Sequence, residues 1–259
     1  LKDMEKAAAR LAGGIAARET IGIFGDYDVD GATSAALLHR FIEMVGGKIE
    51  IYVPDRIKEG YGPNLPAMLA FKEKGIDLVV TVDCGITAFE PLAGAAEAGM
   101  DVVVVDHHVA EPRLPAAAAV VNPNRLDDYS SMGRLAAVGV AFLLVVSLNR
   151  QLRADGWYQN RKEPNLLQWL DLVALGTVCD VVPLVGLNRA FVSQGLKIMA
   201  RRSNLGIRAL ADVASVDEAP TAYHAGFILG PRVNAGGRVG EAGMGARLLT
   251  TPNADEARD

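Results

Sequence analysis

Short apolar runs alternate with amphipathic segments through the first two-thirds of the chain. The apolar runs predict strands near residues 21–25, 49–53, 78–82, 102–105 and 119–121. The segments between them predict helices near residues 32–45, 64–74, 87–98 and 136–152. Apolar residues recur at helical spacing in the segment 32–45, namely Leu38, Phe41, Ile42 and Val45. This alternation predicts an α/β fold with a doubly wound, mainly parallel sheet that helices cover on both faces.

The pattern changes at about residue 153, where strand-like runs become scarce. Helices are predicted near 165–175, 188–202 and 205–214, and a Gly-rich loop with two arginines is predicted at 230–238. We therefore expect one domain over residues 1–250, with an α/β part at about 1–152 and a helical lobe at about 153–250. Residues 251–259 resemble the capped first turn of a helix whose continuation is missing, and the chain begins at Leu1. These ends indicate a fragment of a longer protein.

Composition narrows the class of protein. Half of the 259 residues are apolar, which is enough to bury a substantial core. No stretch resembles a transmembrane span or a signal peptide, and two cysteines do not make a disulfide framework, so we expect a cytoplasmic protein with no membrane role. The net charge of −5 argues against a generally basic nucleic-acid-binding surface. It leaves room for a phosphate held by metal ions and a few arginines.

Three of the predicted strands run directly into aspartate. The residues that follow them are, in order, Asp26, Asp28 and Asp30; Asp83; and Asp106, His107 and His108. Because the carboxyl ends of parallel strands share one edge of the sheet, these side chains should converge there. Carboxylates gathered so closely repel one another unless cations lie between them. The pattern predicts a metal site, most simply one with two ions.

Some of these aspartates have an alternative structural interpretation. An aspartate in such a turn can cap the helix that follows, a role that suits Asp26 or Asp30. Three aspartates cannot all cap one helix, which favours metal binding by Asp28 and Asp30. Asp83 alone would be an ordinary turn residue. As the third acid on the same edge, it suits a carboxylate that bridges two cations.

The Asp106-His107-His108 tripeptide is the most specific signal. Imidazole binds Mn, Fe, Co or Zn readily, whereas Mg prefers oxygen ligands. Asp106 could orient one ring by accepting its second N–H. His39 and His224 have no comparable neighbours, and we interpret them as ordinary surface or core histidines.

A fourth acid, Asp180, lies in the otherwise apolar segment 175–184, where an aspartate needs a partner. Asp171 is a competing candidate, although its place in an amphipathic helix suits a solvated or capping role. Cys84 and Cys179 each neighbour a proposed ligand. We interpret them as small buried side chains rather than as thiolate ligands.

An Asp/His cluster with two ions fits the hydrolysis of phosphoesters or anhydrides, because the ions activate a water molecule and neutralise charge on the phosphoryl oxygens. Arginine recognises phosphate through paired hydrogen bonds. The candidates are Arg56, Arg232 and Arg238, and Tyr61 could stack on a base. Arg56 is favoured over an ordinary surface arginine because the adjacent segment 60–62, Gly-Tyr-Gly, suits a ligand loop.

Together these residues resemble the DHH phosphoesterase superfamily and, within it, the RecJ family of single-stranded-DNA exonucleases. The matching motifs occur in order along nearly the whole chain: GDYDVDGATS at 25–34, DRIKEGYG at 55–62, VTVDCGIT at 80–87, VVDHHV at 104–109, VNPN at 121–124, VGVAF at 138–142, LVALGTVCDVVPL at 172–184 and GPRVNAGGR at 230–238. The motifs at 55–62, 172–184 and 230–238 favour the RecJ family over the pyrophosphatases and oligonucleotide-degrading members of the superfamily.

The resemblance implies a role for each candidate residue. It makes metal ligands of Asp28, Asp30, Asp83, His107 and Asp180, with Asp83 as the bridging ligand. Asp83, Asp106 and His108 would form the catalytic group, with His108 beside the attacked phosphate. The substrate-binding residues would be Arg56 at the 5′ phosphate, Tyr61 near the terminal nucleotide, and Arg232, Asn234 and Arg238 along the DNA path.

The chain departs from the family pattern in two ways. Many superfamily members place His four residues before the first ligand aspartate, where this chain has Phe24. One of the two ions should then have fewer protein ligands and bind more weakly. RecJ proteins also continue into a DHHA1 domain and an oligonucleotide-binding fold. Residues 251–259 are expected to begin the linker helix to the DHHA1 domain, and the fragment alone is expected to have low activity.

Three hypotheses for function follow from the sequence. The first is a 5′→3′ exonuclease that degrades single-stranded DNA to 5′ mononucleotides with Mn²⁺ or Mg²⁺ in DNA repair and recombination. We expect this enzyme to be a monomer. The family resemblance implies that it interacts with single-stranded-DNA-binding protein and a helicase. The second is a small-molecule phosphohydrolase acting on pyrophosphate, polyphosphate or short oligonucleotides. The third, a non-enzymatic replication scaffold, is disfavoured because the candidate ligands are all present.

Overall fold

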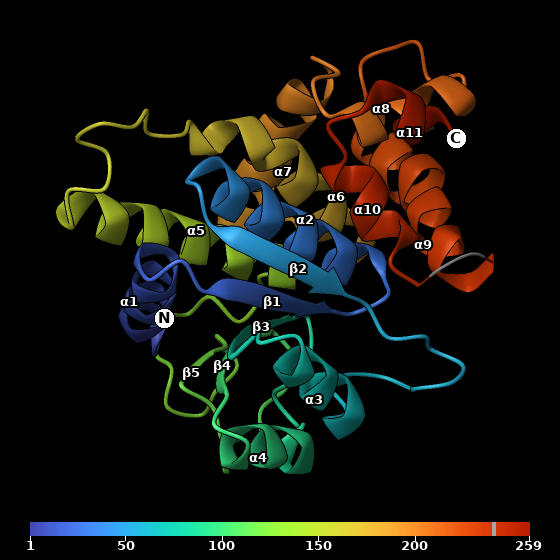
Figure 1. Cartoon of the computed structure of the whole chain (residues 1–259). Coiled ribbons are helices and arrows are strands. Elements are labelled where there is room, and N and C mark those ends of the chain that lie inside the picture. The colour runs from blue at the N-terminus through green and yellow to red at the C-terminus, as the bar shows by residue number, and fades with distance from the viewer. Residues whose placement is uncertain (240–241) are drawn as a thin grey trace.

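The chain forms a five-stranded parallel sheet in the order β2-β1-β3-β4-β5 (Figure 1). The computed structural model describes residues 1–239 and 242–259, and the side chains of residues 237–239 lie outside the described part. The strands are β1 (Thr20–Gly25), β2 (Lys48–Tyr52), β3 (Leu78–Val82), β4 (Asp101–Val105) and β5 (Ala119–Val121). The predicted doubly wound parallel sheet is confirmed. The strand order reverses beside β1, and ligands of such sheets bind at the carboxyl ends of the strands near this reversal.

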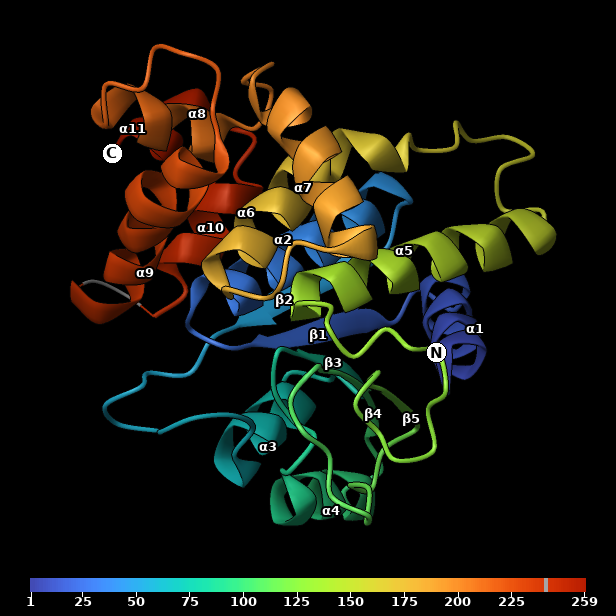
Figure 2. The ribbon, with the colours of Figure 1, turned by 180° about the vertical axis from the view of Figure 1, so that it is seen from behind.

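Helices cover both faces of the sheet (Figures 1 and 2). One face carries α1 (Met4–Ala16), α2 (Val29–Met44) and α5 (Ala137–Ala154), and the other carries α3 (Leu65–Glu73) and α4 (Phe89–Glu97). Successive residues of a strand point to opposite faces. Ile23 and Val80 therefore enter the larger core beneath α2 and α5, while Phe24 and Val79 enter the smaller core beneath α3 and α4.

The remaining helices follow α5 in the chain. They are the 3₁₀ helix η1 (Leu166–Trp169), α6 (Leu170–Cys179), α7 (Gly186–Met199), α8 (Leu205–Val213), the π-helix η2 (His224–Leu229), α9 (Gly230–Val239), α10 (Met244–Thr250) and α11 (Ala254–Arg258). Helix α6 packs between α2 and α7, and α10 packs on α2. The helical lobe thus shares the core of the sheet. Asn253 caps α11 by accepting a hydrogen bond from the Asp255 N–H, as the sequence of this terminus suggests.

The Gly-rich segment at 230–238 is a helix, and its prediction as a loop was wrong. Gly230 lies so close to α6 that a Cβ atom would stand 2.3 Å from the Cys179 Sγ. Val233, one turn further on, is buried in the core. Glycine here permits close packing of two helices instead of a flexible backbone.

Helix α5 is the one helix in the described part of the chain that is long and apolar enough to cross a membrane. However, 61% of its 18 residues are buried in the structure, where α5 packs against α1, α2 and α6. These contacts make it a helix of the protein core.

Candidate metal centre

The acidic residues converge at the carboxyl edge of the sheet and at the end of α6. Three groups each bring one potential ligand atom per residue within 4.8 Å of the others. The groups are Asp83 with His107 and His108, Asp30 with His107 and Asp180, and Asp26 with Asp28 and Asp83. Shared members join the groups into one cluster. Every residue predicted as a metal ligand lies in it.

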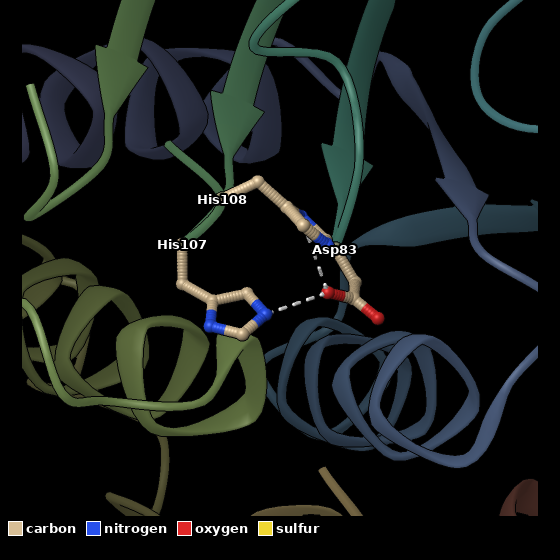
Figure 3. Close-up of side chains that lie close together, drawn as sticks. All are labelled: Asp83, His107 and His108. Atoms are coloured by element: carbon tan, nitrogen blue, oxygen red, sulfur yellow. Dashed lines mark ion pairs between the residues drawn. The ribbon is translucent and has the colours of Figure 1, made fainter. Parts of the chain in front are cut away.

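The tandem histidines approach Asp83 from the neighbouring strand (Figure 3). His107 Nε2 lies 3.2 Å from Asp83 Oδ1, and His108 Nδ1 lies 3.9 Å from the same oxygen. The rings stand 4.7 Å apart between centroids and are inclined by 58°. Both rings turn toward the sheet edge because the two histidines lie beyond the end of β4, where the backbone has left the pleat.

Several atoms of the cluster are buried without a hydrogen-bond partner. They are Asp26 Oδ1, Asp83 Oδ1, His107 Nε2 and Asp180 Oδ2. Buried polar atoms in proteins are almost always hydrogen-bonded, so four unpartnered atoms in one cluster require a reason. Carboxylate oxygens and an imidazole nitrogen are the ligands that Mn²⁺ and related cations take. The donor set therefore fits divalent cations.

Burial and mutual repulsion oppose ionisation of these carboxyl groups. Burial, together with Asp180, raises the pKa of Asp30 well above its ordinary value, and burial together with Asp30 does the same for Asp83. Burial and the Asp28 charge raise the pKa values of Asp26 and Asp180 to about 7. Cations would relieve this cost by balancing the negative charge.

Asp30 is held by the start of α5. Its Oδ2 accepts a hydrogen bond from the Ala137 N–H at 2.6 Å, and its Oδ1 accepts one from the Val138 N–H at 2.8 Å. These N–H groups have no partner within the helix, and the positive end of the helix dipole favours a carboxylate there. The 138–142 motif thus orients a candidate ligand that lies more than 100 residues earlier in the chain.

Asp106 differs from the other acids because hydrogen bonds surround it. Its Oδ1 accepts from the backbone N–H groups of His107 and His108 and lies 2.7 Å from His108 Nδ1, while its Oδ2 accepts from the Ile86 N–H. Burial opposes its ionisation, but the bonds and charge of His108 outweigh burial and lower the pKa of Asp106. The same contact raises the pKa of His108. Asp106 therefore orients the His108 ring, as the sequence suggested for one of the two imidazoles.

The aspartates in the turn after β1 have different roles from those suggested by the sequence for a helix cap. Asp28 is the N-cap of α2, where its side chain accepts a hydrogen bond from the Gly31 N–H at 3.0 Å. The suggestion that Asp26 or Asp30 caps this helix was wrong. Asp26 instead joins Asp28 and Asp83 in the cluster, although sequence reasoning had not chosen it as a ligand. Its place in the same short acidic motif was the available signal.

Asp171 is not solvated, so one of the two roles suggested for it, solvated or capping, was wrong. It is buried in the first turn of α6, where it accepts a hydrogen bond from the Leu172 N–H. Burial raises the pKa of Asp171 to about 6, against the attraction of Arg40. Asp171 belongs to no metal-binding group among the described residues. Cys84 is buried as expected, and Cys179 is half-buried.

Asp83 adopts a backbone conformation that places its side chain at the cluster. Its φ of 60° lies in the left-handed region, which is uncommon for residues other than glycine. The Tyr61 hydroxyl donates to the Asp83 carbonyl oxygen at 3.0 Å and lies 3.4 Å from His108 Nδ1. Tyr61 is thereby brought to the metal centre, with half of its surface exposed.

The other predicted substrate residues lie on two segments. Arg56 stacks over the Tyr27 ring at 4.9 Å and faces the charge of Asp26. Arg232 lies on α9, is exposed, and donates to the Ile228 carbonyl. Asn234, on the same helix, has a buried Oδ1 without a partner. Arg238 lies in the last turn of α9, and its side chain is outside the described residues.

Phe24, at the position where many superfamily members have His, is fully buried. Its ring packs against Tyr52 at 5.5 Å in the core beneath α3 and α4. It offers no ligand atom, so the group of Asp26, Asp28 and Asp83 consists of carboxylates alone.

The fold and the acidic site define a class of protein. Residues 20–177 match the model of the DHH family, N-terminal domain, and the chain belongs to this family. Within the family, its sequence is similar to those of the RecJ single-stranded-DNA-specific exonucleases. It is 45% identical to the protein from Dickeya dadantii, with 94% of this chain and 43% of the relative covered. It is 42% identical to the protein from Escherichia coli, with 100% of this chain and 46% of the relative covered.

Solved structures show the same fold. A crystal structure of exonuclease RecJ bound to manganese matches with a TM-score of 0.87 and 37% identity, covering 100% of this chain and 63% of that one. RecJ from Thermus thermophilus in complex with Mg²⁺ matches with a TM-score of 0.72 and 32% identity, covering 100% and 33%. The chain spans less than half the length of the curated relatives described above.

Proposed function

We propose that the chain is the catalytic domain of a cytoplasmic, metal-dependent exonuclease that degrades single-stranded DNA in the 5′→3′ direction to 5′ mononucleotides. The observation that carries the proposal is the cluster of unpartnered carboxylate and imidazole atoms at the sheet edge. The similarity to RecJ exonucleases supports single-stranded DNA as the substrate. A role in DNA repair and recombination follows from the same similarity.

The cluster would hold two ions with unequal sets of protein ligands. Asp30, His107 and Asp180 supply mixed oxygen and nitrogen ligands, which suit Mn²⁺, while Asp26 and Asp28 supply oxygen alone, which suits either Mn²⁺ or Mg²⁺. Asp83 shares one group with Asp26 and Asp28 and another with His107, which also belongs to the group of Asp30 and Asp180, so Asp83 would be the bridging ligand. Because Phe24 contributes no ligand, the all-carboxylate site would be the weaker one. Divalent cations bound here would activate water and neutralise charge on the phosphoryl oxygens.

Side chains of this chain would orient the substrate. Because His108 Nδ1 is hydrogen-bonded to Asp106, the other ring nitrogen, Nε2, would be available to the attacked phosphate. Arg56 would bind the 5′ phosphate, and the Tyr61 ring would contact the terminal nucleotide. Asn234, Arg232 and Arg238 on α9 would line the path of the strand. Single-stranded-DNA-binding protein and a helicase are proposed as partners of a monomeric enzyme.

The test compares substrates and variants in the presence of Mn²⁺, both in this chain and in a longer protein that contains it. A long 5′-phosphorylated single strand should be degraded from its 5′ end faster than a dinucleotide or pyrophosphate. Asp83→Ala should abolish the activity. Asp101→Ala is the matched control, because Asp101 begins β4 at the opposite edge of the sheet and pairs with Arg10. Preference for pyrophosphate or dinucleotides would instead show a small-molecule phosphohydrolase.

A further inference from the structure

Two asparagines after β5 hold the backbone of the tandem histidines. Asn122 Nδ2 donates to the His108 carbonyl oxygen at 2.9 Å, and Asn124 Nδ2 donates to the His107 carbonyl oxygen. Asn122 Oδ1 in turn accepts from the Asn124 N–H at 2.7 Å. Asn122 is fully buried and Asn124 is half-buried. The 121–124 motif therefore contacts both histidines through their backbone carbonyl groups.

The histidine backbone depends on these contacts because it lies beyond the end of β4. The sheet ladder between β4 and β5 ends at the pair Val105 and Val121. Both N–H groups of His107 and His108 donate to Asp106, and both carbonyl groups accept from an asparagine. Side chains thus satisfy all four backbone polar groups of the two residues.

We propose that Asn122 and Asn124 are positioning residues that set the orientations of the His107 and His108 rings. The inference deepens the proposed function and rests on it where it concerns metal binding. Two adjacent residues whose rings must reach the same carboxylate need a fixed backbone. Partners that orient metal-binding histidines are typically worth about 10–100-fold in metal affinity.

The chemistry of the amide group explains why asparagine occupies these positions. A carbonyl oxygen needs a donor, and the amide supplies one without adding charge to a cluster already crowded with carboxylates. Asn124 Nδ2 also donates to the Gly133 carbonyl at 3.2 Å, and a Cβ at Gly133 would stand 2.4 Å from Asn124 Oδ1. The close approach of Gly133 thus ties the loop before α5 to the same amide.

The first test measures Mn²⁺ affinity by calorimetry for Asn122→Ala and Asn124→Ala. Asn149→Ala is the control, because Asn149 is a buried amide on α5 that bonds Glu163 and Tyr158 away from the cluster. We expect both positioning variants to lose at least about tenfold in affinity. The control should lose stability in urea while its affinity changes less than about threefold. Mn²⁺ affinity close to that of wild type in both positioning variants would overturn the proposal.

The second test uses the metal-free chain and separates this inference from the proposed function. The chain has only four histidines, so their ring nitrogen signals can be assigned by nuclear magnetic resonance. We expect Asn122→Ala and Asn124→Ala to shift the His107 and His108 ring signals, and Asn149→Ala to leave them in place. Ring signals that stay unchanged in the positioning variants would refute the inference. A wild-type chain that binds no Mn²⁺ would refute the proposed function alone. The histidine ring signals would still test the positioning role of Asn122 and Asn124.

Discussion

His107 Nε2 lies 3.2 Å from Asp83 Oδ1, yet both atoms are buried and neither has a hydrogen-bond partner (Figure 3). Burial, followed by the charge of His108, lowers the pKa of His107, so its ring is neutral at neutral pH. The short distance is therefore not a salt bridge. Two unpartnered ligand atoms at this separation support the proposal that these residues bind a cation.

Asp83→Asn should have opposite effects on metal binding and on metal-free stability. Replacing the shared carboxylate should lower Mn²⁺ affinity at least about 100-fold, because a neutral amide is a poor ligand. In EDTA the variant should gain roughly 1 kcal/mol of unfolding free energy, because one repelling carboxyl group is removed. Asparagine tolerates the left-handed backbone at this position. Calorimetry and urea unfolding provide the measurements, and a variant that loses stability in EDTA would contradict the interpretation.

Mn²⁺ affinity should rise with pH. The pKa values of Asp26 and Asp180 are about 7 in the metal-free structure, so below pH 7 these groups hold protons that a cation must displace. We expect affinity to increase by at least about tenfold from about pH 6 to about pH 8 and then level off. Titrations in buffers of different ionisation enthalpy should show proton release at the lower pH. Affinity that is constant over this range would argue against these carboxyl groups as ligands.

Asp106→Asn should impair turnover more than metal binding. Asp106 orients His108 and belongs to none of the metal-binding groups among the described residues. An amide cannot accept all of its present hydrogen bonds, so kcat should fall by about 10²–10³-fold while Mn²⁺ affinity changes less than about fivefold. Asp127→Asn, which removes a carboxylate paired with Arg125, is the control. A loss of Mn²⁺ affinity as large as that of Asp83→Asn would make Asp106 a ligand instead.

Asp171→Asn should stabilise the fold above pH 6. The folded-state pKa of Asp171 is about 6, whereas an unfolded aspartate titrates near about 4. Between these values the folded state holds a proton that the unfolded state has released, so this group lowers stability as pH rises from about 4 to 6. The variant should therefore exceed wild type by about 1–3 kcal/mol at neutral pH and match it below about pH 4. Urea unfolding in EDTA across this range measures the difference, and a difference independent of pH would disprove the assignment.

The strand pattern and the acidic motifs determined much of this protein from sequence alone. Short apolar runs with turn signals at their ends have few alternatives to buried parallel strands, so every strand was located to within one residue. Parallel topology then places the residues after each strand on one edge. The convergence of Asp28, Asp83 and His107 was predictable for that reason.

Only the tertiary structure decided what depends on close approach between distant segments. The helix at 230–239 packs closely against Cys179 through Gly230, and the burial of Asp171 follows from packing of α6 between α2 and α7. Local sequence periodicity carries no information about these partners. The orientation of His107 and His108 by Asn122 and Asn124 likewise depends on bonds across 14–17 residues. Sequence established which chemical groups reach the sheet edge, whereas packing set the angles at which they meet.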